Sequence, residues 1–252
     1  MKSHIRKIFG YLVSTLAAIG FTIVVVPTAL VVLATPGLER RRRVAGMAAR
    51  MSLRAGGNRL KVSGLEQLPD DRPCVVVANH ASYLDGIVLQ GALPPNFSFV
   101  IKREMERVPL VNFLLIRLGS QYVDRSDRRK GGRDALRILR LAKSGQALGF
   151  FPEGTFDEEP GLKRFHLGAF TAAARHKLPI CPILIKGTRS ILPADAWLPK
   201  PGRIEVQILD CLDPPENHDQ ASVKALRDQA RETILTHHVE PDLLLSQTLS
   251  NV

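Results

Sequence analysis

The chain has 252 residues, 45% of them hydrophobic, so it can bury a sizeable core and form one globular domain with an appendage. Its formal charge is +11, but residues 1–56 alone carry +8, and this segment is also the most apolar part of the chain. A segment both basic and apolar suits an anionic membrane surface and not a nucleic-acid groove. The three cysteines are far apart, so we expect no disulfide framework, no zinc ribbon and a reducing compartment.

Residues 11–34 contain no charged side chain and are long enough to cross a bilayer, which needs roughly 20 apolar residues. Pro27 lies inside this run and would kink a helix or split it into two arms, so a straight span and a re-entrant hairpin both stay open. A cleaved signal peptide is the other alternative, although its apolar region would run only about 7 to 15 residues.

Four consecutive arginines, residues 40–43, directly follow the apolar run. The positive-inside rule places this end of the run at the cytoplasm. Apolar residues then recur at helical spacing at Val44, Met47, Ala48 and Met51. They predict an amphipathic helix in the membrane interface, with a surface helix of the following domain as the alternative. We therefore predict a membrane-anchoring segment over residues 1–56 in the cell membrane, and a cytoplasmic domain over residues 57–252.

Beyond residue 57, short apolar runs alternate with helical stretches, which is typical of an α/β fold with a largely parallel central sheet flanked by helices. Strands are predicted over residues 74–78, 98–102, 121–123, 147–151, 180–186 and 204–209. Helices are predicted over residues 83–93, 109–118, 129–143, 168–176 and 220–238. In such a sheet, residues just past the carboxyl ends of the strands line the functional crevice.

Two polar clusters follow predicted strands in this way: "NHASYLD", residues 79–85, and "FPEGTF", residues 151–156. His80 could act as a general base, with Asp85 holding one ring nitrogen so that the other accepts a proton. Ser82 and Asp85 also fit a capping box, which gives Asp85 a structural explanation. No GxSxG, HExxH, GxGxxG or P-loop pattern accompanies the pair. A base without an enzyme nucleophile indicates direct transfer to a hydroxyl of the substrate.

Four blocks together resemble the glycerolipid acyltransferase family, whose best-known members are the 1-acylglycerol-3-phosphate acyltransferases. "NHASYLD" resembles the family's NHxxxxD motif, and "GSQYVDR", residues 119–125, resembles its second block. "FPEGT" matches the third block, and "LPICPILI", residues 178–185, resembles the fourth. The blocks occur in the family's order over residues 74–185, which makes the set far more specific than any one motif.

The resemblance implies a membrane-bound enzyme, without metal or cofactor, whose acyltransferase domain is residues 57–252. It would move a fatty acyl group from acyl carrier protein or coenzyme A to the free hydroxyl of a lysophospholipid, most closely 1-acylglycerol-3-phosphate, giving phosphatidic acid. His80 would deprotonate that hydroxyl and Asp85 would orient His80. The implied substrate-binding residues are Arg125 for the acceptor phosphate, and Glu153, Gly154 and Thr155. Lys102, which ends another predicted strand, is a candidate for stabilising developing negative charge.

Two positions depart from the family pattern, and both concern the acceptor phosphate. Phe156 stands where an arginine is common, and His166 stands where a lysine is common. Lys163 and Arg164 are close enough in sequence to replace these cations. A lysolipid with another head group, such as lyso-ornithine lipid, is therefore an alternative acceptor.

Two other classes of function also stay open. One is a non-catalytic membrane lipid-binding protein. The other is a metal-dependent hydrolase, whose ligands would be His80, Asp85, His166, His237 and His238.

Overall fold

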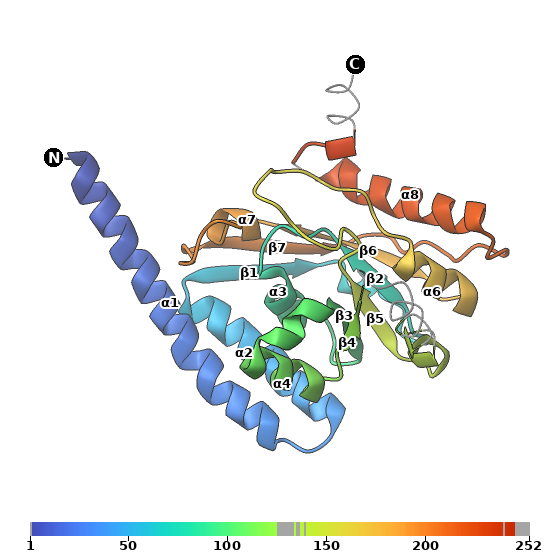
Figure 1. The fold of residues 1–252 in the computed structure, drawn as a ribbon, viewed down its shortest axis with the longest axis horizontal. Coiled ribbons are helices and arrows are strands. Elements are labelled where there is room, and N and C mark those ends of the chain that lie inside the picture. Colours follow the sequence, from blue (N-terminus) through green and yellow to red (C-terminus); the bar gives the residue numbers. More distant parts are fainter. Residues whose placement is uncertain (1, 125–133, 135–136, 139, 239, 245–252) are drawn as a thin grey trace. The chain divides into compact units, whose positions relative to one another are not determined.

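The structure is a computed structural model that describes residues 2–124, 134, 137–138, 140–238 and 240–244. Seven strands form a sheet in the order β1-β7-β6-β2-β5-β3-β4 (Figure 1). The strands are β1 (Asn58–Ser63), β2 (Val75–Ala78), β3 (Phe97–Lys102), β4 (Gln121–Val123), β5 (Ala147–Phe150), β6 (Ile180–Lys186) and β7 (Gly202–Ile208). The main helices are α1 (Lys2–Ala34), α2 (Leu38–Ala55), α3 (Asp85–Ala92), α4 (Pro109–Arg117), α6 (Gly168–His176), α7 (Thr188–Ile191) and α8 (Gln220–His237). Two short 3-10 helices, η1 (Leu65–Gln67) and η2 (Arg103–Arg107), complete the described elements.

The centre of the sheet is parallel, as the sequence predicts. β2 pairs in parallel with β5 and β6, and β3 pairs in parallel with β4 and β5. All four residues of β2 are buried, which is why this strand is a continuous apolar run and not an alternating one. Val77 of β2 lies opposite Phe150 of β5. This register brings Asn79 and His80, the first two residues of the NHxxxxD motif, and the FPEGT block to the same edge of the sheet.

The chain divides into two compact units, and the first comprises residues 1–62, 81–95 and 185–206. In this unit α1 is one continuous helix with Pro27 inside it, so residues 2–34 form a single helix and not the two arms of a hairpin (Figure 1). Among the described residues, Gly10–Ala34 is the one helical stretch long and apolar enough to cross a membrane. Its insertion stays a prediction, as does a domain boundary near residue 56.

Helix α2 packs along α1 and against α3 within the first unit. Its buried face carries Ala45, Ala49 and Leu53. Arg50 donates a hydrogen bond to the carbonyl oxygen of Gly91 in α3. Met47 and Met51, two residues of the predicted apolar stripe, are exposed. The helix therefore packs through one face and keeps methionines on another, and the placement of that second face in a membrane interface stays a prediction.

The second unit comprises residues 63–80, 96–184 and 207–252, and it holds a core between the sheet and two helices, α6 and α8. Side chains of β2, β5 and β6 meet those of α6 and α8 there. Helix α8 is capped by Asp219, whose carboxylate accepts the N–H of Ser222 at 2.8 Å. Leu162 and Phe165 are fully buried in the same core. The loop that follows the FPEGT block is thus anchored on the sheet.

The expectation of no disulfide is wrong. Cys181 in β6 and Cys211 form a disulfide, although 30 positions separate them in the sequence. The reason is tertiary: the preceding residue Ile180 pairs antiparallel with Leu212 through two backbone hydrogen bonds of 2.9 and 2.7 Å. The third cysteine, Cys74, is free and buried, and burial raises the pKa of its thiol to about 12.

Candidate active site

His80 lies just beyond the carboxyl end of β2, where two aromatic rings fix its imidazole. The ring stacks on Phe151 with a centroid separation of 4.2 Å and an interplanar angle of 18°. Phe156 makes a T-shaped contact with it at 4.7 Å and 69°. Both phenylalanines flank the EGT of the third block. These two ring contacts restrict the orientation of the imidazole.

Glu153 joins the third block to the first through main-chain hydrogen bonds. Glu153 is 5% exposed, and its Oε1 accepts the main-chain N–H of His80 at 2.6 Å. Oε2 accepts the N–H of Lys163 at 2.8 Å. Gly154 follows with a φ of 84°, a backbone conformation that favours glycine and turns the chain back after Glu153. The predicted residues His80, Glu153, Gly154 and Lys163 thus lie together in the second unit, beside the exposed Thr155.

Asp85 belongs to the first unit and is fully buried at the first residue of α3. Its Oδ2 accepts the N–H groups of Ala81 at 2.7 Å and Ser82 at 2.8 Å. The bond to Ser82 has the backward reach of a capping-box acid, but it spans the turn before α3, whose N-cap residue is Leu84. Because Ala81 directly follows His80, the Asp85 carboxylate binds the N–H of the peptide bond that joins the predicted base to Ala81.

The predicted cations differ in where the structure places them. The ammonium of Lys163 pairs with Asp157 and lies 3.4 Å from the carbonyl oxygen of Thr155. Lys102, at the end of β3, pairs with Glu104 at 3.3 Å. Arg164 is exposed, and Arg125 lies outside the described residues. Of these cations, Lys163 is the one whose main chain contacts Glu153, and its ammonium forms an ion pair with Asp157.

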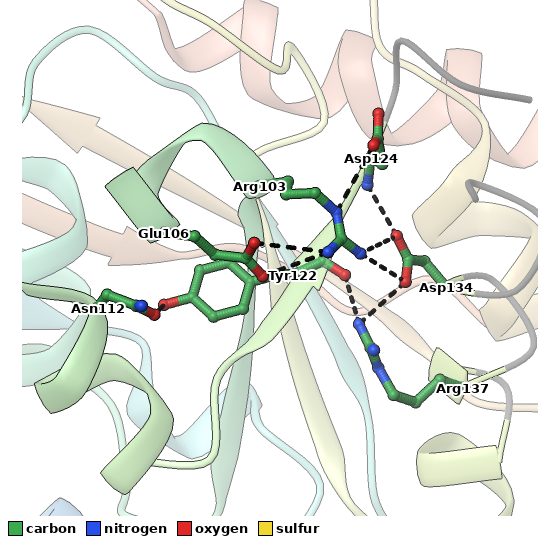
Figure 2. Close-up of polar contacts among 7 residues, drawn as sticks. All are labelled: Arg103, Glu106, Asn112, Tyr122, Asp124, Asp134 and Arg137. Carbon is green, nitrogen blue, oxygen red and sulfur yellow. Dashed lines mark hydrogen bonds and ion pairs between the residues drawn. The ribbon is translucent and has the colours of Figure 1, made fainter. Parts of the chain in front are cut away.

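An ion-pair network around the buried Asp134 fixes the end of β4, directly before Arg125 (Figure 2). Both carboxylate oxygens of Asp134 accept hydrogen bonds from the Arg103 guanidinium, at 3.1 and 2.9 Å. Asp134 also accepts the main-chain N–H of Asp124 at 2.9 Å. Burial alone would raise the pKa of Asp134, but the Asp124 N–H and the Arg103 guanidinium outweigh burial and hold that pKa below its ordinary value. The hydrogen bond to Asp134 in turn raises the pKa of Arg103. The network is a scaffold for the second block and not an open anion site.

Histidines other than His80 have separate partners. His166 is exposed, and its main-chain N–H donates to the carbonyl oxygen of Pro152 at 2.8 Å. His237 Nδ1 contacts the carbonyl oxygen of Thr233 at 2.9 Å, and His238 Nε2 lies 3.2 Å from Asn79 Nδ2. Within the described part of the chain, no three His, Cys, Asp or Glu side chains gather to form a metal site. The Asn79 contact of His238 and the ring contacts of Phe151 and Phe156 are site features that the sequence reasoning missed.

Residues 59–186, just over half of the chain, match the family described as Acyltransferase. The chain belongs to the acyltransferase family. The matched residues contain all four blocks and end one residue beyond the fourth, and they include His80, Asp85 and Glu153.

Several curated acyltransferases align with this chain. The chloroplastic 1-acyl-sn-glycerol-3-phosphate acyltransferase BAT2 of Brassica napus is 37% identical over 133 residues, which are 52% of this chain and 38% of the relative. A 1-acyl-sn-glycerol-3-phosphate acyltransferase of Chlamydomonas reinhardtii is 32% identical over 193 residues, 75% of this chain and 56% of the relative. The chain thus spans about 38% to 56% of the length of these acyltransferases.

A solved acyltransferase shares the fold. The crystal structure of the 1-acyl-sn-glycerophosphate (LPA) acyltransferase PlsC from Thermotoga maritima superimposes with a TM-score of 0.74. The match covers 92% of this chain and 97% of that chain at 22% sequence identity. The arrangement of helices around a seven-stranded sheet is therefore the fold of a known acyltransferase.

Proposed function

We propose that this protein is a lysophospholipid acyltransferase that moves a fatty acyl group from acyl carrier protein or coenzyme A to the free hydroxyl of 1-acylglycerol-3-phosphate. Family membership and the names of the relatives support this activity. The observation that carries the proposal is the 2.6 Å hydrogen bond from the main-chain N–H of His80 to the Glu153 carboxylate, because it joins two acyltransferase blocks at one point.

In the proposed reaction, His80 removes the proton from the acceptor hydroxyl, and the hydroxyl oxygen attacks the carbonyl carbon of the thioester. The tetrahedral intermediate collapses and the carbon–sulfur bond breaks. The leaving thiolate then takes from His80 the proton that came from the acceptor hydroxyl. Asp85 orients His80 and stabilises its charged form. The two hydrogen bonds that Asp85 accepts, from the N–H groups of Ala81 and Ser82, support this role. They fix the carboxylate beside the main chain that directly follows His80.

Arg125, Lys163 and Arg164 are the proposed ligands of the acceptor phosphate, since guanidinium and ammonium groups bind phosphate oxygens well. Thr155 and Gly154 would line the same end of the site, and Lys102 would act near the developing negative charge. The Phe156 ring favours a second candidate acceptor, because it occupies the place of a common family arginine and contacts the base itself. That acceptor is a lysolipid with another head group, such as lyso-ornithine lipid.

We also propose that α1 inserts in the cell membrane and that the acyltransferase domain, residues 57–252, faces the cytoplasm. The apolar stretch Gly10–Ala34 and the arginines that begin α2 support this arrangement. The lysolipid acceptor would then reach the protein from the bilayer, and the soluble thioester donor would reach it from the cytoplasm.

An acyltransfer assay tests the proposal directly. The purified full chain would be given lysophosphatidate or lyso-ornithine lipid, with acyl carrier protein or coenzyme A thioesters as donors. We expect phosphatidic acid to form, and His80→Ala to lower the rate about 10² to 10⁴-fold because general-base help is lost. His237→Ala is the matched control, since that imidazole contacts only its own helix in the described contacts.

The same assay separates the alternatives. Product with lyso-ornithine lipid alone would move the acceptor to that head group. Lipid binding without His80-dependent product from any acceptor would indicate a binding protein and contradict the proposal. Loss of activity on chelation would instead indicate a metal-dependent enzyme.

A further inference from the structure

The end of the chain contacts both of the blocks that meet at His80. We define the C-terminal clamp as Arg231 and His238 together with residues 240–244. All of its contacts with the two blocks lie inside the second unit. None of its residues belongs to the four blocks, and the family match ends at residue 186.

Arg231 holds the loop that follows the FPEGT block. Its side chain is 8% exposed, and it donates from Nη2 to the carbonyl oxygen of Leu162 at 2.7 Å and from Nε to that of Lys163 at 2.9 Å. Asp242 holds the guanidinium in place, accepting a bond from Nη1 at 3.0 Å and another from Nη2. A planar fork with several fixed donors is suited to this arrangement, and a lysine cannot reproduce it.

Main-chain contacts add to this hold on the loop. The Gly161 N–H donates to the Glu240 carboxylate at 2.9 Å, and the Leu162 N–H donates to the carbonyl oxygen of Pro241 at 3.0 Å. A Cβ on Gly161 would lie 2.5 Å from Leu243 Cγ. The clamp is therefore packed against the loop so closely that only glycine fits there.

The loop passes this restraint to His80 through one side chain. Lys163, whose carbonyl oxygen Arg231 binds, donates its N–H to Glu153, and Glu153 accepts the N–H of His80. A second route is shorter, because His238 Nε2 lies 3.2 Å from the buried Asn79 Nδ2, one residue before His80. The two routes begin in the clamp and end on adjacent residues of the NHxxxxD motif.

We propose that the C-terminal clamp positions His80, with Arg231 acting through Lys163 and Glu153 and His238 acting through Asn79. Neither residue contacts the reacting atoms in this proposal, so both are positioning residues. The inference rests on the proposed acyltransferase function for its kinetic consequence. Its structural consequence, a restrained main chain at His80 and Lys163, does not depend on that function.

The test compares Arg231→Lys and His238→Phe with wild type in hydrogen exchange and in acyltransfer. We expect faster exchange of the His80 N–H in both variants, and of the Lys163 N–H in Arg231→Lys, because the restraint on their acceptors is loosened. We expect kcat to fall about ten- to a hundredfold with little change in KM for the lysolipid, since a small misplacement of the base affects turnover most. His238→Gln, which retains a polar group near Asn79, should recover part of the kcat lost in His238→Phe.

Asp219→Ala is the matched control, because it removes the cap of the same helix without touching the clamp. It should destabilise α8 and leave both kcat and exchange at His80 unchanged. Asp242→Asn serves in place of Arg231→Lys if the latter fails to fold. Wild-type exchange and wild-type kcat in the folded clamp variants would overturn the proposal. An inactive wild type would contradict the proposed function alone, and the exchange measurement would still decide on the clamp.

Discussion

At the scale of single residues, Glu153 shows how a motif acid links two separate sequence blocks through their main chains. Both of its carboxylate oxygens accept main-chain N–H groups, one from His80 and one from Lys163. A buried carboxylate with two such donors satisfies the requirement that buried polar groups be hydrogen-bonded. In this geometry Glu153 anchors the main chain of His80 and of Lys163, and its contact with the acceptor stays a prediction.

We predict that Glu153→Gln lowers the free energy of unfolding by about 1 to 3 kcal/mol, because an amide has one acceptor oxygen and its NH₂ group would face an N–H donor. Urea unfolding followed by circular dichroism measures this change. Acyltransfer should fall at the same time, since His80 loses its main-chain anchor. Glu158→Gln, at an exposed acid of the same loop, is the control. Equal stability of the two variants would contradict the role given to Glu153.

Sequence reasoning found the motif residues from spacing but missed what their side chains contact. Phe156 was noted as a departure from the family pattern, yet its contact with the His80 ring depends on the path of the loop after Gly154. His238 contacts Asn79 across 159 positions of sequence, and no local pattern encodes such a distance. Long-range side-chain contacts of this kind are set by the packing of whole elements.

At the scale of elements, the strands buried on both faces were the easiest to predict. β2, β5 and β6 appear within one residue of the predicted bounds, because a parallel strand covered on both faces is an apolar run. β1 was missed, since its exposed positions carry Arg59 and Lys61 and it lies at the edge of the sheet. α7 was missed because its four residues are too few to show a helical period.

The network at the end of β4 gives a pH-dependent prediction for an element. The pKa of Asp134 is depressed in the folded protein, so its contribution to stability is present above its unfolded pKa of about 3.9 and is lost as pH falls through the folded value. Asp134→Asn should therefore lower the free energy of unfolding by about 1.5 to 3 kcal/mol near neutral pH, because the substitution removes hydrogen bonds to a charged carboxylate.

Unfolding of wild type and Asp134→Asn across a pH series measures this contribution. The difference between the two proteins should begin to narrow below about pH 4, where the unfolded chain protonates Asp134, and should disappear as pH falls through the lower pKa of the folded protein. Asp157→Asn is the control, at an acid that is largely exposed. A difference that stayed constant down to the lowest pH would show that the charge of Asp134 does not support the β4 end.

At the scale of the whole molecule, charge and apolar surface are concentrated in the same segment. Residues 1–56 hold +8 of the +11 net charge, and α1 exposes large apolar side chains along its length, among them Tyr11, Leu16, Ile23 and Leu30. Water does not favour such a helix, whereas hydrocarbon does, because all of its main-chain groups except those near the ends and beside Pro27 are satisfied within the helix. An enzyme whose acceptor is a lysolipid would then meet its substrate in the bilayer.

We predict that α1 anchors the protein in the bilayer as an inserted helix. The stretch Gly10–Ala34 has 25 residues, about 37 Å of helix at roughly 1.5 Å per residue, against a hydrocarbon core of about 30 Å. Membranes that contain the full chain should therefore retain it through washes with high salt and with alkaline carbonate, which remove proteins held by charge alone. A variant carrying both Leu16→Glu and Ile23→Glu should be released, because two exposed apolar positions of α1 would become charged. Release of wild type by salt would instead show that the arginines at the start of α2 hold the protein at the surface.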